Sequence, residues 1–166
     1  MHCFHISYPV FGDFATGTIV FPTGTFSFSG HKIPGGDQIL AIVKTDVPTT
    51  AKLCDETVLA LTERYPACRS ELLAVTAFGR PVRTLVIGTG PRTVLFTAAH
   101  HANEWITAPL LLKFMEELAQ AAEDGGQLLD TDARALLEQV RICTVPMVDP
   151  DGVDLVTGGI QPGQCC

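Results

Sequence analysis

The chain has 166 residues, of which 46% are hydrophobic and 17% charged, and its formal net charge is -7 at pH 7. This composition is typical of a globular protein and excludes a disordered one. The acidic balance, with Lys and Arg scattered singly, argues against nucleic acid or an anionic membrane surface as a partner. No stretch reaches the roughly 18 consecutive apolar residues that a membrane span needs.

The first 42 residues are rich in Gly, Phe, Thr and Pro. Short alternations at 18–21 and 25–28 indicate two or three short strands or an irregular arm. No basic segment or continuous apolar run marks a signal peptide, so the chain as written is expected to stay in the cytoplasm. Three histidines lie in this arm without metal-ligand spacing: His2, His5 and His31. We treat residues 1–42 as an arm of unclear origin and residues 43–166 as the main domain.

The next elements are a helix and several strands. The pattern predicts a helix that begins after Thr49 and Thr50 and ends before Pro66. Residues 68–77 are typical of a strand, and residues 78–81 of a turn. Strand patterns at 84–87 and 93–97 flank a Gly-Thr-Gly-Pro segment, which predicts a hairpin. That Gly-x-Gly is not a dinucleotide fingerprint, because no third glycine opens a helix after it.

The rest of the chain alternates helices with one strand. The helix predicted at 104–122 is expected to stop at the Asp-Gly-Gly of residues 124–126. The helix predicted at 130–139 is expected to be capped by Asp130 or Thr131. A strand end or bulge is expected at Pro146, which lacks an N–H for a central strand. The predicted elements are helices at 104–122 and 130–139, a central strand at 141–148 and a turn at 149–152. This order predicts a three-layer α/β domain.

The stretch from 93 to 118 carries the strongest chemical signal. A buried strand passes through small residues to His101 and Glu104, and a long amphipathic helix follows. Ligands gather outside the carboxyl ends of strands in open α/β sheets, and a His nitrogen with a Glu carboxylate suits zinc. A His-x-x-Glu spacing is weak evidence alone, because Glu104 is also favoured in the first turn of any helix. Spacing alone therefore leaves two interpretations open, a zinc site and an ordinary polar helix start.

The amino-acid sequence around His101 and Glu104 resembles that of a known family. HHANEWITAPLLLKFMEEL, at 100–118, is similar to the first metal-binding segment of the zinc carboxypeptidases, with its His-x-x-Glu and Trp-Ile-Thr. VPMVDPDGVDLV, at 145–156, resembles a second family segment, and residues 61–90 look like its helix, Gly-Arg turn and edge hairpin. The resemblance is strongest to the bacterial γ-D-glutamyl-diamino-acid endopeptidases, which cut peptidoglycan stem peptides. It implies a three-layer α/β/α fold with a mixed central sheet.

The resemblance also implies roles for individual residues. His101 and Glu104 match the first two zinc ligands, and Asn103 matches a substrate-binding position where the animal digestive enzymes carry arginine. His100 is expected to support the site or line the cleft rather than to bind the metal, because its side chain should point to the opposite face of the strand. Trp105 is expected to pack under the helix start. The implied cofactor is Zn²⁺, and the implied partner is a peptide or peptidoglycan stem-peptide substrate.

The family's later residues have no counterpart in the sequence. Its third histidine ligand and catalytic glutamate follow the Asp-Pro-Asp-Gly segment, but no histidine follows His101 here. No general base is therefore identified, and we expect a truncated, N-terminal half of a zinc metallopeptidase that is inactive alone. The alternative is a non-catalytic remnant or binding module of the same fold. Serine hydrolases and P-loop enzymes are disfavoured, because Gly-x-Ser-x-Gly and Gly-x-x-x-x-Gly-Lys are absent.

The cysteines show no Cys-x-x-Cys spacing and no zinc-knuckle pattern. Most are expected to be reduced thiols in the core or at the surface, Cys143 among them within an apolar strand. The adjacent Cys165 and Cys166 have no role that we can assign. The six positions are Cys3, Cys54, Cys68, Cys143, Cys165 and Cys166.

Overall fold

The computed structural model describes residues 16–21, 24–29, 41–128 and 130–160. The chain divides into two compact units, Met1–Ile39 and Leu40–Cys166. In the first unit, β1 (Thr16–Phe21) and β2 (Gly24–Ser29) form an antiparallel pair, which agrees with the short strands expected there. The three histidines of the arm lie outside the described residues. The assignment of residues 1–42 as a separate arm stays a prediction.

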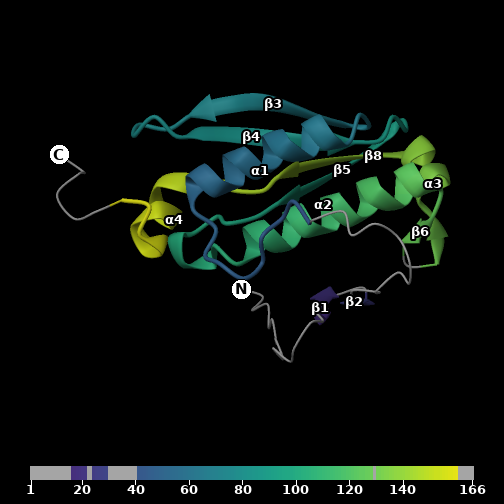
Figure 1. Ribbon diagram of the computed structural model, residues 1–166, viewed down its shortest axis with the longest axis horizontal. Helices are drawn as coiled ribbons and strands as arrows, with labels where there is room; N and C mark the ends of the chain where they lie inside the picture. Colours follow the sequence, from purple (N-terminus) through teal and green to yellow (C-terminus); the bar gives the residue numbers. More distant parts are fainter. Residues whose placement is uncertain (1–15, 22–23, 30–40, 129, 161–166) are drawn as a thin grey trace. The chain divides into compact units, whose positions relative to one another are not determined.

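The second unit carries a four-stranded mixed sheet in the order β3-β4-β8-β5 (Figure 1). The first three strands of this order pair antiparallel, and β8 pairs parallel with β5. The α/β class with a mixed sheet and flanking helices is therefore confirmed. The strands are β3 (Cys68–Val75), β4 (Pro81–Ile87), β5 (Arg92–Thr97) and β8 (Val140–Val145).

The predicted hairpin between β4 and β5 is wrong, because β8 lies between these two strands. The connecting loop packs instead on the junction between α3 (Ala133–Gln139) and β8. The backbone N–H groups of Thr89 and Gly90 donate to the carbonyl of Leu137 at 3.0 and 3.2 Å. A Cβ at Gly90 would lie 2.1 Å from the backbone nitrogen of Val140. The glycines thus serve a close backbone approach rather than a two-residue turn.

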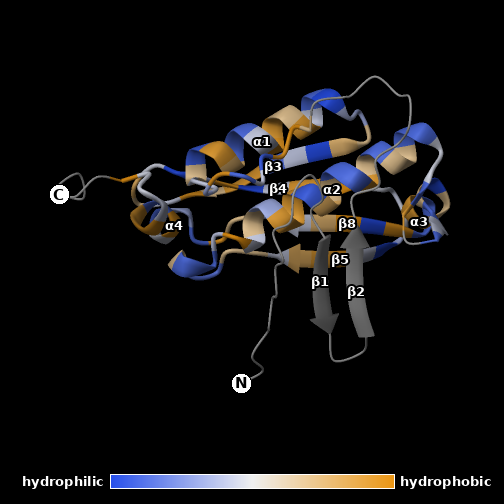
Figure 2. Ribbon diagram, turned by 60° about the horizontal axis from the view of Figure 1, so that its bottom comes forward, coloured by the Kyte–Doolittle hydropathy of each residue, from blue (hydrophilic) through white to orange (hydrophobic). Residues whose placement is uncertain are grey.

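Two long helices, α1 (Ala51–Arg64) and α2 (Thr107–Asp124), cover the same face of the sheet (Figure 1). Hydrophobic and hydrophilic stretches alternate along both helices, as the 3.6-residue period requires (Figure 2). The core contains fully buried residues from these helices and from β4. They include Val58, Leu61, Leu85, Ile87, Leu112, Met115 and Leu118. On the opposite face of β5, Leu95 is 61% exposed.

The helix ends follow local chemistry. The Thr50 hydroxyl caps α1 by accepting from the backbone N–H of Leu53 at 3.2 Å. Gly125 ends α2 with a left-handed backbone, φ +66°. The helix predicted from Glu104 begins at Thr107, after a short 3-10 turn η1 (Ala102–Glu104). These two helices are otherwise where the sequence pattern predicts them.

Two local predictions need correction. The cap of α3 is Asp132, whose carboxylate accepts from Ala135, and not Asp130 or Thr131. Asp130 has φ +59° and connects two short strands, β6 (Gln127–Leu128) and β7 (Thr131–Asp132). The segment expected to be a turn at 149–152 opens a helix, α4 (Pro150–Thr157). As expected, β8 ends before Pro146.

The described cysteines agree with the expectation of reduced thiols. Cys54 and Cys68 are buried, and Cys143 is half-buried, without disulfides. Burial raises the pKa of Cys54 to about 12 and that of Cys68 to about 11, so both stay protonated. Within the described ranges, no helix is long and apolar enough to cross a membrane.

Candidate metal centre

His101 and Glu104 stand where β5 leads into α2. Because β5 and β8 are parallel, their carboxyl ends meet at one edge of the sheet. The chain leaves that edge at Ala98, reaches His101, and then forms η1, which ends at Glu104. This position matches the edge where α/β sheets bind ligands. A short, hydrogen-bonded turn therefore presents both side chains from a rigid strand end.

The structure brings the two predicted ligands together. Nδ1 of His101 lies 3.0 Å from Oε1 of Glu104. The two side chains are 75% and 45% exposed, so the pair lies at the surface. The hydrogen bond with His101 lowers the pKa of Glu104 below its ordinary value. A metal ligand must be ionised, and this shift favours the ionised form of Glu104. We call these two residues the His101–Glu104 pair.

The pair fits zinc in type and spacing. Zinc binds imidazole nitrogen and carboxylate oxygen at roughly 2.0 to 2.2 Å, which puts two ligands of a tetrahedral site roughly 3.4 Å apart. The observed 3.0 Å needs a change of only a few tenths of an ångström. Zinc peptidase sites take three protein ligands. Within the described parts of the chain, no third His, Cys, Asp or Glu joins the pair. The pair therefore offers two donor atoms, one fewer than such a site takes.

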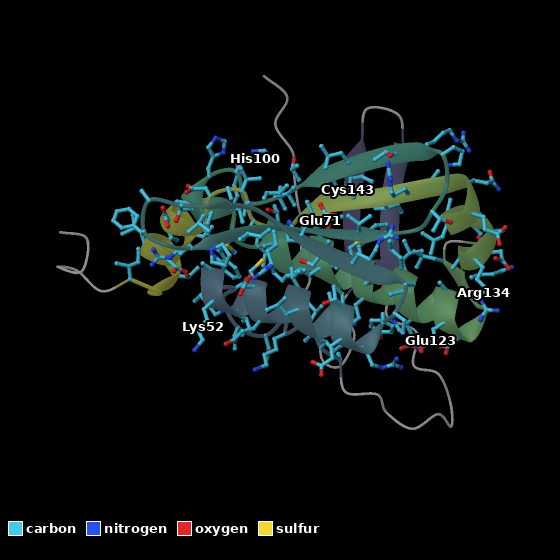
Figure 3. All side chains as sticks on the ribbon, turned by 90° about the horizontal axis from the view of Figure 1, so that it is seen from above. Lys52, Glu71, His100, Glu123, Arg134 and Cys143 are labelled. Atoms are coloured by element: carbon cyan, nitrogen blue, oxygen red, sulfur yellow. The ribbon has the colours of Figure 1, made fainter. Side chains whose placement is uncertain are left out.

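The neighbouring residues take different positions. The ring of His100 contacts the hydroxyl of Thr97, with Nε2 and Oγ1 2.8 Å apart, and lies at the surface (Figure 3). Asn103 is exposed in η1, beside the pair in sequence, and its substrate-binding role stays a prediction. Trp105 is half-buried and packs against the hydrophobic core, as expected. Among the described residues from Thr97 to Trp105, His101 and Glu104 are the two whose donor atoms lie together.

The segment after β8 is hydrogen-bonded to the residues that connect β5 to the His101–Glu104 pair. The backbone N–H groups of Val148 and Asp149 donate to the carbonyls of Ala98 and Ala99 at 3.0 and 2.9 Å. Ala99 is buried and has φ +48°, a backbone conformation that an alanine adopts only where its surroundings enforce it. The chain therefore turns sharply at Ala99, under constraint from a segment 50 residues away.

The Asp-Pro-Asp-Gly segment has a larger structural role than its sequence indicated. Asp149 caps α4, and its carboxylate accepts from the N–H of Gly152 at 3.0 Å. A Cβ at Gly152 would lie 2.1 Å from the Asp149 carboxylate and 3.1 Å from the Cβ of Ala102. Gly152 thus lets α4 approach η1. The cap was readable from the Asp-Pro pair, but its contact with η1 was not.

A second group of charged residues joins α4 to the rest of the unit. Arg80, in the turn between β3 and β4, pairs with Asp154 at 2.5 Å and with Asp151 at 3.2 Å. The other carboxylate oxygen of Asp154 accepts from the N–H of Ala51, the first residue of α1, at 2.7 Å. An open cavity of about 350 Å³ lies beside Arg80 and Phe78. The His101–Glu104 pair does not line it.

Comparison with known proteins supports the relationship read from the motifs. The model of a family described as zinc carboxypeptidase matches residues 55–161. A curated relative, gamma-D-glutamyl-L-diamino acid endopeptidase 1 of Lysinibacillus sphaericus, is 32% identical over 95 residues, 57% of this chain and 24% of the relative. The chain thus spans about a quarter of that relative's length.

Solved structures show the same fold. Thrombin activatable fibrinolysis inhibitor matches with a TM-score of 0.61 and 16% identity, over 78% of this chain and 35% of that chain. A metallo-carboxypeptidase from Burkholderia cenocepacia matches with a TM-score of 0.53 and 23% identity, over 84% and 36%. At these identities the likeness concerns the fold. In both cases this chain corresponds to about a third of the neighbour.

Proposed function

Because the chain belongs to the zinc carboxypeptidase family, we propose that it carries part of the active site of a zinc metallopeptidase, with His101 and Glu104 as two of the three zinc ligands. The observation that supports this proposal is the 3.0 Å separation of Nδ1 and Oε1 at the carboxyl end of β5. Zinc, when bound, activates water for attack on a peptide carbonyl. The chain's own contribution is to hold two donors in a fixed, solvent-open position.

The proposed substrate is a peptide with a γ-D-glutamyl–diamino acid bond, such as a peptidoglycan stem peptide. This part of the proposal rests on the 32% identity to the endopeptidase of Lysinibacillus sphaericus. Asn103 is consistent with it, because asparagine cannot form the charged, bidentate pair with a carboxylate that arginine forms. A specificity for free C-terminal carboxylates would need such a cation.

A second candidate function is a binding module that does not hydrolyse its peptide. The observation in its favour is that the described residues supply two metal donors and no third. Two protein ligands bind zinc weakly, and the described chain offers no assigned general base. A peptide that binds with and without zinc, and is not cut, would favour this second function.

The test is calorimetric titration of zinc into the purified 166-residue chain. We expect one zinc per chain, with an affinity that falls at least about tenfold in His101→Ala. His100→Ala is the matched control, because it removes the adjacent imidazole, which contacts Thr97 and not Glu104. Equal zinc binding by wild type and His101→Ala would contradict the proposed site. Incubation of the same proteins with a γ-D-glutamyl–diamino acid peptide then separates a peptidase from a binding module.

A further inference from the structure

One hydroxyl group joins the two ends of the turn that carries the His101–Glu104 pair. Oγ1 of Thr107 accepts from the backbone N–H of Ala99 at 2.8 Å and donates to the backbone carbonyl of Glu104 at 2.8 Å. The backbone bends sharply at Ala99, just before the pair. Glu104 is the carboxylate member of the pair. The hydroxyl therefore connects the start of the turn directly to its functional end.

The first of these bonds satisfies an N–H group that this backbone leaves without a regular partner. Ala99 is 1% exposed and lies past the end of β5, so its N–H has neither water nor a strand partner. Ile106, at the start of α2, makes no side-chain capping bond. A buried N–H without a partner is unfavourable, and the positive φ of Ala99 adds strain. The Thr107 hydroxyl thus gives the buried N–H of Ala99 its partner, while Asp149 holds the Ala99 carbonyl.

We propose that Thr107 is a positioning residue for zinc: its hydroxyl holds Ala99 and Glu104 in the arrangement that places the Glu104 carboxylate beside the His101 imidazole. This inference rests on the proposed function, because it assigns the pair as ligands. The Thr107 hydroxyl acts through backbone groups, the N–H of Ala99 and the carbonyl of Glu104. Residues that orient metal ligands without binding the metal typically change metal affinity about ten- to hundredfold when they are replaced.

Three variants separate the hydroxyl from the rest of the side chain. Thr107→Val has the same shape but cannot make either bond. Thr107→Ser keeps the hydroxyl and loses only a methyl group, so it should restore what valine removes. Thr57→Val is the matched control: Thr57 is a buried threonine of α1 whose hydroxyl donates to the carbonyl of Leu53 at 2.7 Å. That bond lies inside a helix, away from the turn.

The experiment titrates zinc into the full chain and its variants. We expect the dissociation constant to rise about ten- to hundredfold in Thr107→Val, and to stay within about threefold of wild type in Thr107→Ser and Thr57→Val. The amide of Ala99 should lose its protection from hydrogen exchange in Thr107→Val alone. Zinc binding by Thr107→Val within threefold of wild type would overturn the proposal, as would an equal loss in Thr107→Ser.

A zinc-free measurement keeps this inference distinct from the proposed function. The nuclear Overhauser effect between the His101 ring proton Hε1 and the Glu104 side chain reports their approach without metal. If wild type shows no zinc binding that depends on His101, the proposed function fails, and this signal alone decides the role of Thr107. Its loss in Thr107→Val, with retention in Thr107→Ser and Thr57→Val, supports a positioning role. Its retention in Thr107→Val overturns that role.

Discussion

Replacing Asp154 with alanine removes the carboxylate that joins three elements of the fold. One of its oxygens accepts from the first N–H of α1 at Ala51, and the other accepts from Arg80 in the turn between β3 and β4. Asp154 is 5% exposed, and the Arg80 side chain is 19% exposed. The substitution leaves the buried N–H of Ala51 without its partner, and it leaves the half-buried Arg80 guanidinium with Asp151 as its remaining carboxylate partner.

The expected cost follows from these contacts. Removing one partner of a buried ion pair destabilises a protein by about 3 to 5 kcal/mol. The lower end applies here, because Arg80 keeps its contact with Asp151 at 3.2 Å. We therefore expect a loss of about 3 kcal/mol of unfolding free energy. With an m-value of about 2 kcal/mol/M, the urea midpoint should fall by about 1.5 M.

The assay is urea unfolding followed by circular dichroism. Glu56→Ala is the matched control, because it removes the carboxylate of an exposed ion pair with Lys52, whose side chains are 58% and 83% exposed. Such a pair contributes about 0 to 1 kcal/mol. A loss below about 1 kcal/mol in Asp154→Ala, or one equal to that of the control, would refute the reasoning from burial and hydrogen bonding.

Two further predictions concern the loop after β4 and the metal pair. Gly90→Ala should cost about 3 kcal/mol, because its Cβ would overlap the backbone of Val140, whereas Gly79→Ala, at φ +79° in open space, should cost about 1 kcal/mol; equal urea midpoints would contradict this. Without zinc, Glu104 should titrate in NMR below its ordinary pKa of 4.5, and His101→Ala should raise that pKa. Because the folded pKa is the lower one, the stabilisation is complete above the unfolded pKa and is lost as the pH falls through the folded pKa; an unchanged pKa in His101→Ala would exclude the hydrogen bond as its cause.

Features that depend on near neighbours in the chain were predictable from the sequence. Thr50 at the start of α1 and Gly125 at the end of α2 act through groups within a few residues of themselves. The same holds for the His101–Glu104 pair, because one 3-10 turn is enough to bring residues three apart together. These two helix ends and this pair are local outcomes of residue type and spacing.

The position of β8 between β4 and β5 was not predictable in this way. A glycine-rich connection between two strand patterns normally indicates a hairpin, and nothing in residues 81–97 reveals a strand that arrives from residues 140–145. In the observed arrangement Gly90 approaches the backbone at the start of β8, a contact that a side chain at this position would block. Local turn chemistry describes the loop, but the pairing partner depends on packing across 50 residues.

By itself, the sequence determined the α/β class, both ends of α1 and the end of α2, because helix caps and hydrophobic periodicity act over short distances. It also set His101 and Glu104 three residues apart, which is enough for one turn to bring them together. The tertiary structure alone decided the strand order and the support of the ligands. Ala99 bends because Asp149 and Thr107 hold its carbonyl and its N–H. Its buried polar groups must find partners wherever the fold offers them, and those partners are set by packing rather than by spacing in the chain.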